Sequence, residues 1–206
     1  MTSPSTPTRL RLFCAVELSA EARARAADHI ERLRQSAPHL KVSWERTEKL
    51  HLTLKFLGAV EPERVPALHE AAARAAAAVA PFELTLRGTS GFPLGRSPRV
   101  LWLGVVDESG RLKLLERRLE EECAAAGFAR EERPFHAHVT LARIRTVNAA
   151  ARRLARYHET TGFAPVASPV RELTVMRSDL TADGSRYTPL ARHPLGGSEQ
   201  QTASSE

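Results

Sequence analysis

The 206-residue sequence lacks the features that mark several common classes of protein. Its 2 cysteines, Cys14 and Cys123, are too few for a disulfide framework and form no Cys-x-x-Cys pair, so both are predicted to be small, reduced core residues. No apolar run approaches the roughly 20 residues that cross a bilayer. The first nine residues also lack the apolar stretch of a secretory signal. We therefore expect a cytoplasmic protein without a membrane partner.

Several motifs of nucleotide-driven and nucleophilic chemistry are missing as well. There is no Walker loop and no Gly-x-Gly-x-x-Gly, so the phosphate cradles of ATP-driven ligases and dinucleotide enzymes are absent. There is no Gly-x-Ser-x-Gly elbow, and neither cysteine adjoins a histidine. Positive charge is in excess, with 30 Lys and Arg against 24 Asp and Glu, a net charge of +6. This charge suits a polyanion such as RNA, but an arginine- and alanine-rich coding bias explains it equally well.

Strand-like and helix-like segments are mixed along the chain. Ser19 and Asn148 are good N-caps for the helices that follow them. Asp183-Gly184, between two strand-like runs, is a strong hairpin signal. This mixture predicts an α+β fold with antiparallel sheet rather than a doubly wound parallel one. The expected strands are 9–18, 41–44, 50–57, 82–87, 100–106, 136–143, 170–178 and 186–193, and the expected helices are 20–35, 61–80, 111–126 and 148–157.

Two of the expected strands carry the same short motif, in which His, an apolar residue, Thr and Leu follow one another. The copies are 51–54 and 138–141. Because side chains alternate along a strand, His and Thr of each copy share one face while the apolar residues face a core. Chance gives two such matches in fewer than about one chain in a hundred. One copy alone would be an ordinary polar strand face; two matching copies indicate a site.

The chemistry of two such pairs is that of phosphodiester cleavage. One imidazole, of His51 or His138, can act as base toward the attacking oxygen while the other protonates the leaving oxygen, since histidine titrates near neutrality. The hydroxyls of Thr53 and Thr140 can donate to non-bridging phosphate oxygens. Neither strand offers the Asp, Glu or Cys ligands that usually complete a metal site, so we expect no metal and no cofactor.

Beyond these motifs, much of the chain resembles a known family, the RNA 2′,3′-cyclic phosphodiesterases of bacteria and archaea. These proteins are also called 2′-5′ RNA ligases and belong to the two-histidine (2H) phosphoesterase superfamily. The resemblance is carried by segments 11–15, 51–58, 98–104, 133–141 and 178–180, followed by Gly184 and Tyr187.

The resemblance implies a bilobal, pseudo-symmetric 2H fold in which antiparallel sheets, flanked by helices, place the two motifs across a central cleft. It implies hydrolysis of an RNA 2′,3′-cyclic phosphate to a 2′-phosphate, with His51 as proton donor to the leaving 3′ oxygen and His138 as proton acceptor from water. It also implies a reverse reaction, 2′-5′ ligation. The partner would be RNA with a cyclic phosphate end, such as tRNA halves, bound by a monomer.

The remaining candidate residues have both a functional and a structural interpretation. Arg143 is a candidate phosphate ligand, although strict alternation puts it off the active face unless the strand bulges. Lys55 shares the motif face by alternation and is either a phosphate contact or a solvated lysine. His136 is a substrate contact or a polar packing residue, with packing preferred. Phe56 is able to stack a base, but alternation assigns Phe56 and the apolar environment assigns Trp102 to the core.

We divide the chain into a flexible N-terminus (1–8), one bilobal domain (9–194) and a disordered tail (195–206). Two rival functions remain. A 2H enzyme for a small cyclic nucleotide or a nucleotide-sugar would keep the histidine pair but would not gain activity with RNA length. A non-catalytic RNA-binding module would keep its function when either histidine is replaced.

Overall fold

A computed structural model describes residues 9–94, 98–181 and 184–196. The expected flexible segment 1–8 and most of the expected tail lie outside these residues. The described strands are β1 (Leu10–Glu17), β2 (Val42–Trp44), β3 (His51–Val60), β4 (Phe82–Phe92), β5 (Val100–Val106), β6 (His138–Ile144), β7 (Val166–Val170), β8 (Glu172–Thr181) and β9 (Gly184–Pro194). The helices are α1 (Ala20–Ser36), α2 (Val65–Ala77), α3 (Arg111–Ala125) and α4 (Ala149–Thr161), with 3₁₀ turns at Thr47–Lys49 and Pro62–Arg64.

The strands form one curled antiparallel sheet made of two halves. The strand order is β7-β4-β5-β6-β3-β1-β8-β9, and β2 adds to β6. At the centre, the register between β3 and β6 has a single residue pair, Leu52 opposite Val139. Beyond it the two strands diverge, β6 toward β2 and β5 and β3 toward β1. The two motif strands therefore meet at one point and open into the two halves.

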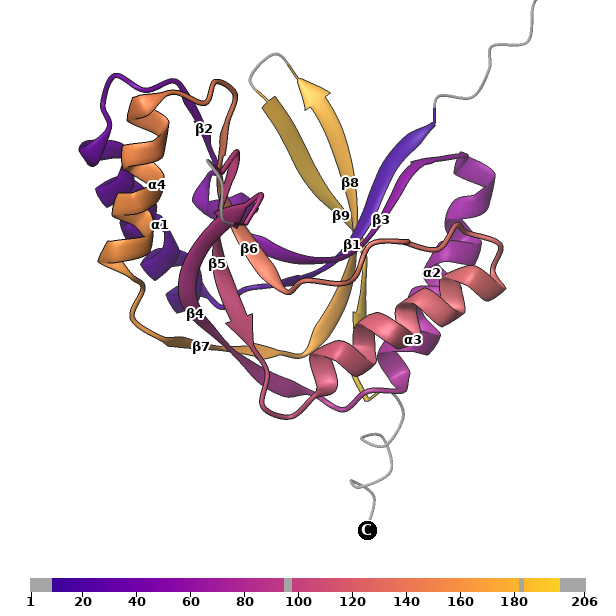
Figure 1. The fold of residues 1–206 in the computed structure, drawn as a ribbon. Helices are drawn as coiled ribbons and strands as arrows, with labels where there is room; N and C mark the ends of the chain where they lie inside the picture. Colours follow the sequence, from indigo (N-terminus) through magenta and orange to yellow (C-terminus); the bar gives the residue numbers. More distant parts are fainter. Residues whose placement is uncertain (1–8, 95–97, 182–183, 197–206) are drawn as a thin grey trace, which may run out of the picture.

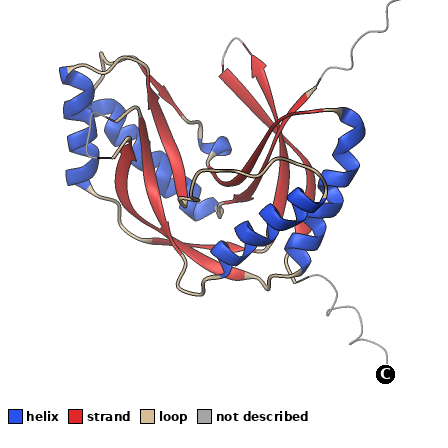
Figure 2. Ribbon diagram, turned by 45° about the vertical axis from the view of Figure 1, so that its right-hand side comes forward, coloured by secondary structure: helices blue, strands red, loops and turns tan. Residues whose placement is uncertain are grey.

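The helices cover the two halves from outside. The pair α1 and α4 lies on one half and the pair α2 and α3 on the other, with the β8–β9 hairpin rising between them (Figure 1). Seen from the side, both helix pairs flank the curled sheet (Figure 2). The predicted caps are confirmed: Ser19 Oγ accepts from the Ala22 amide at 3.1 Å, and Asn148 Oδ1 accepts from the Ala151 amide at 2.9 Å. In the described chain no helix combines the length and apolarity that crossing a membrane requires.

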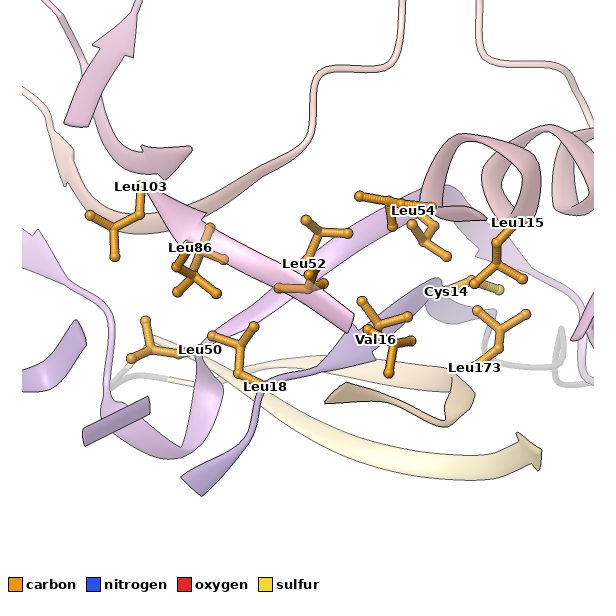
Figure 3. Close-up of a cluster of buried hydrophobic side chains, with 14 of the residues drawn as sticks. Cys14, Val16, Leu18, Leu50, Leu52, Leu54, Leu86, Leu103, Leu115 and Leu173 are labelled. Carbon is orange, nitrogen blue, oxygen red and sulfur yellow. The ribbon is translucent and has the colours of Figure 1, made fainter. Parts of the chain in front are cut away.

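One continuous core joins the two halves behind the motifs. Leu52 of the first motif lies in the middle of a cluster that reaches Leu86 and Leu103 on one side and Val16 and Leu173 on the other (Figure 3). All five side chains are fully buried. The apolar residues of each motif therefore anchor the strands, as alternation predicts, and leave the His and Thr side chains on the opposite face.

The expected elements differ from the structure in a few places. Strand β7 was not predicted because Pro169 interrupts its apolar pattern. It pairs only with β4 at the edge of the sheet, where a missing N–H is tolerated. Strand β4 continues beyond Arg87 to Phe92, and the helix expected from Glu61 begins with a 3₁₀ turn, so that α2 starts at Val65.

Two buried histidines connect α1 with α4 and with the central sheet. The Nε2 atom of His29 lies 2.9 Å from Nδ1 of His158, whose Nε2 lies 3.1 Å from the carbonyl oxygen of Trp102. The Arg32 guanidinium is 3.2 Å from the other ring nitrogen of His29. These contacts are satisfied together only by neutral imidazoles, each donating from Nε2 and accepting at Nδ1. Burial, His158 and Arg32 lower the pKa of His29 from 6.5 to about 4.

This pair predicts a loss of stability in mild acid. Because the pKa of His29 is lower in the folded state, the unfolded state binds more protons between pH 6.5 and 4, and the stabilisation present above pH 6.5 is lost as the pH falls. We expect the loss to be on the order of 3 kcal/mol. Urea unfolding at pH 7 and pH 4.5 measures it. His29→Met should flatten this pH dependence and His39→Gln, at an exposed position, should retain it; an equal slope in all three proteins would contradict the assignment.

Candidate active site

A cleft of about 870 Å³ lies between the two halves of the sheet. This volume is in the upper part of the range of ligand sites. All five residues that the sequence predicts for the site line this cleft: His51, Thr53, His138, Thr140 and Arg143. The structure therefore brings together in one cavity residues that are as much as 92 positions apart in the chain.

The pairing of Leu52 with Val139 determines how the four motif side chains are arranged. Both residues are fully buried, so their neighbours on each strand point into the cleft. In an antiparallel ladder this register sets His51 beside Thr140 and Thr53 beside His138. The two imidazoles are then diagonal neighbours across this pair.

His51 is held on three sides. Its Nδ1 donates to the carbonyl oxygen of Lys49 at 2.6 Å, which leaves Nε2 available for other contacts. Nε2 lies 3.0 Å from the Thr53 hydroxyl, which donates to it when the ring is neutral and accepts from it when the ring is protonated. The rings of Phe13 and Tyr187 lie 5.0 and 5.3 Å from the imidazole and form an apolar wall.

His138 has an equivalent environment in the other half. Its Nδ1 donates to the carbonyl oxygen of His136 at 2.7 Å, again two residues earlier in the chain. The rings of Phe92 and Trp102 lie 5.1 and 6.0 Å from it. The His136 ring packs 4.8 Å from Trp102 while remaining exposed in the cleft, so it is both a packing residue and an available contact. Trp102 itself is buried, as predicted.

Both active-face histidines have lowered pKa values, but their electrostatic surroundings differ. Burial is the main cause of the lowered pKa of each ring, and the bond to the backbone carbonyl opposes it. The carboxylate of Glu17 also opposes the shift at His51, because Glu17 lies opposite it on β1. The residue opposite His138 on β5 is Gly104, which carries no charge. The two rings therefore differ in the charge of the residue that is paired with each of them.

A bulge follows the first motif. Thr53 pairs with Ala15 on β1, and Lys55 pairs with Cys14, so that Leu54 between them is an extra residue. The burial pattern changes here as well, because Leu54 and Lys55 are both buried. A bulge reverses the alternation of the residues that follow it.

The second motif has the same bulge. Thr140 pairs with Trp102 on β5, and Ala142 pairs with Leu101, so that Leu141 is the extra residue. The two strands have the same sequence of buried and accessible positions over the six residues that begin with the histidine. The bulge is thus a property of the repeated motif.

The two bulges decide the placement of the remaining candidates. Arg143 lines the cleft because the bulge turns it back to the active face. Phe56 occupies the equivalent position after the first motif, where it lines the cleft with 60% of its surface exposed. Its assignment to the core was therefore wrong, because alternation does not continue through a bulge.

Lys55 is neither a solvated lysine nor a free phosphate contact. Its side chain is 1% exposed, and its ammonium donates to Glu120 Oε1 at 2.6 Å and to the Ala129 carbonyl oxygen at 2.8 Å. It ties β3 to α3 and to the segment that leads to β6. The two cysteines, Cys14 and Cys123, are buried and free, as predicted, and burial is the main cause of their raised pKa values.

Further residues of the cleft were not predicted as site residues. They include two cations, two carboxylates and two aromatic rings: Arg11, Arg133, Glu45, Glu116, Phe92 and Tyr187. Their position relative to the motifs in three dimensions identifies them as cleft residues, since none belongs to a repeated pattern; Arg11, Arg133 and Tyr187 do lie in the segments that carry the family resemblance. Among the described residues, no three His, Cys, Asp or Glu side chains are grouped to hold a metal ion.

The fold and the paired motif strands place this protein among the phosphoesterases of the two-histidine class. The model of the 2′-5′ RNA ligase superfamily matches residues 21–182. The chain belongs to this superfamily.

Relatives and solved structures agree with this assignment. The chain is 31% identical to an RNA 2′,3′-cyclic phosphodiesterase of Thermotoga maritima over 88% of its length and 93% of the relative's. It is 38% identical to one of Geobacillus stearothermophilus, over 66% of this chain and 42% of that protein. Among solved structures, TT0787 of Thermus thermophilus is 30% identical, with a TM-score of 0.74 over 92% of this chain and 100% of that one. Escherichia coli LigT in complex with 3′-AMP is 31% identical, with a TM-score of 0.69 over 91% and 98%.

The buried ion pair beside the site yields a prediction about stability. Removing one partner of a buried pair leaves an uncompensated charge, at a cost of about 3 kcal/mol or more. Glu120→Ala should therefore lower the free energy of unfolding by about this amount in denaturant titrations. Glu122→Ala, on the same helix, breaks a surface pair with Arg74 and should cost about 1 kcal/mol or less. If both variants lost the same free energy of unfolding, the Lys55–Glu120 pair would contribute no more than a surface ion pair, contrary to this prediction.

Proposed function

We propose that this protein hydrolyses the 2′,3′-cyclic phosphate at RNA ends to a 2′-phosphate, by acid–base catalysis from His51 and His138. The observation that carries the proposal is the presence of two imidazoles in one cleft, each with Nδ1 bound to a backbone carbonyl so that Nε2 is left for the reaction. Relatives that bear the name RNA 2′,3′-cyclic phosphodiesterase support the same substrate.

In the proposed reaction, Nε2 of His138 takes a proton from water as the water oxygen attacks phosphorus. The bond from phosphorus to the 3′ oxygen breaks, and Nε2–H of His51 protonates that oxygen. The assignment of His51 as the acid is supported by Glu17, whose negative charge opposes the lowering of its pKa. Each transfer contributes about 10²–10⁴ in rate.

The other predicted site residues bind the phosphate in this scheme. The hydroxyls of Thr53 and Thr140 donate to non-bridging oxygens, and the guanidinium of Arg143 offers two parallel N–H donors to the same group. These contacts stabilise the charge that is redistributed in the transition state. The reverse reaction, in which a 5′-hydroxyl replaces water, uses the same pair and gives 2′-5′ ligation.

The proposal extends to three properties expected from the sequence: one bilobal domain over residues 9–194, a monomeric enzyme and a cytoplasmic location. Among RNAs, tRNA halves are candidate substrates. Relatives named RNA 2′,3′-cyclic phosphodiesterase support RNA over a small cyclic nucleotide, and the completeness of both motifs supports an enzyme over a binding module.

The first test compares the wild type with His51→Ala and His138→Ala on a short RNA that ends in a 2′,3′-cyclic phosphate, in EDTA. The wild type should form the 2′-phosphate, and each variant should lose about 10²–10⁴ of the rate. His39→Ala, at an exposed position outside the cleft, is the matched control and should keep full activity. A wild type that binds this RNA without cleaving it would reject the enzymatic function.

The pH dependence of kcat/KM tests the acid–base pair directly. The profile should be bell-shaped, and its optimum should lie below pH 6.5, because both histidine pKa values are lowered from this ordinary value. The residual activity of His51→Ala should lose the limb at high pH, where the acid deprotonates, and that of His138→Ala the limb at low pH. A flat profile between pH 5 and 8 for the wild type, with chemistry rate-limiting, would contradict the pairing.

A further inference from the structure

One end of the cleft contains a second cationic group that the proposed reaction does not use. Arg11 and Phe56, on the neighbouring strands β1 and β3, line the cleft beyond the pairing of Glu17 with His51, and Arg133 lines the same cleft. Arg143 is the arginine that the proposed reaction uses. Phe56 is five residues beyond His51 along β3, and the Phe13 ring lies between them, 5.0 Å from the imidazole and 6.0 Å from the Phe56 ring. The proposed reaction uses none of Arg11, Phe56 and Arg133, so these residues are free for another part of the substrate.

The Arg133 guanidinium is oriented and yet remains available. Glu131 accepts from its Nε at 2.9 Å and from its Nη2 at 2.9 Å, and the Arg133 amide also donates to this carboxylate. The pKa of Glu131 is lowered to about 2 by these bonds, so it stays ionised. A guanidinium has five N–H donors, and Glu131 uses two of them. The side chain is 81% exposed, so the other donors are accessible from the cleft.

The segment that carries Arg133 is fixed from inside the protein. It runs from α3 across β3 and β1 to β6 (Figure 1). The buried ammonium of Lys55 binds the Ala129 carbonyl oxygen and Glu120, whose second oxygen accepts from the Glu131 amide at 3.4 Å. A buried charge in β3 thus holds the backbone at the point where the Glu131–Arg133 pair begins. In a surface ion pair on a free loop, holding the two side chains in one geometry would cost conformational entropy. Here the backbone that carries the Glu131–Arg133 pair is already held in place.

The opposite wall of this end is suited to a nucleotide. Phe56 presents an exposed ring, on which a base of any kind can stack. Arg11 lies across from Ala59 on the neighbouring strand, and no carboxylate of the described residues forms an ion pair with it. Gly58, also in the cleft lining, leaves open space where a side chain would stand. The cleft therefore offers a stacking surface and two guanidinium groups beyond those that the proposed reaction uses.

We propose that Arg133 and Arg11 form a second phosphate site, which binds the internucleotide phosphodiester next to the cyclic end of the RNA. This proposal rests on the proposed function, because the second site binds the nucleotide linkage of the same RNA that precedes the reacting phosphate. It gives the enzyme a preference for an RNA end over a free cyclic nucleotide. Lys55 and Glu120 are positioning residues for it.

The test compares three substrates that share the same cyclic end: adenosine 2′,3′-cyclic phosphate, the dinucleotide ApA with a cyclic end, and this dinucleotide with an uncharged methylphosphonate linkage. The two dinucleotides have the same bases and differ in one charge. In the wild type, kcat/KM should be about tenfold or more higher for the charged linkage, the value of a charge-assisted hydrogen bond. Arg133→Ala and Arg11→Ala should each lower this ratio, and the double variant should bring it to one.

The matched control is Arg130→Ala, which removes the same charge from the same segment at an exposed position outside the cleft. It should keep the wild-type ratio. An equal ratio in the wild type and the double variant would overturn the second site while leaving the proposed function intact, as would a ratio that falls as much in Arg130→Ala. A wild type that cleaves none of the three substrates would overturn both.

Discussion

The backbone pairing of Leu52 with Val139 is the constraint on which the rest of this structure depends. It is the single point of the described sheet where the two halves are joined through their motif strands. Both side chains are buried in the common core. The histidine and threonine that flank Leu52, and those that flank Val139, must therefore point to the opposite face, toward the cleft. A slip of either strand by one residue in this register would turn the histidine and threonine of that strand into the core.

The bulge after each motif is the second feature that determines which side chains line the cleft. The extra residue after the threonine reverses the alternation of side chains. The residue three positions after the threonine therefore faces the cleft, and the residue two positions after the threonine is buried. Arg143 becomes a cleft residue in one half and Phe56 in the other, while Lys55 is placed in the interior with a carboxylate to neutralise it. The repeated backbone geometry therefore supports different chemistry in each half.

Much of the fold follows from local sequence signals, and the departures have identifiable causes. Apolar alternation, the caps at Ser19 and Asn148 and the turn before Gly184 predict the main elements and the antiparallel class. The repeated motif predicts the location of the site, because it needs no knowledge of tertiary structure. Phe56 was assigned to the wrong face since a bulge depends on the register with a neighbouring strand. Residues such as Arg133 and Glu45 enter the cleft through the path of connecting segments, which no local pattern encodes.

The exposed ring of Phe56 has a further consequence when it is set beside its counterpart Arg143. A cleft built from two identical halves would receive an RNA strand equally well in either polarity, although such a strand differs from 5′ to 3′. Here the two equivalent slots hold an apolar ring and a cation, so the two ways of laying a strand across the histidines are no longer equal in energy. In the proposed function, the departure from two-fold symmetry at this one pair of positions favours one polarity of the RNA strand over the other.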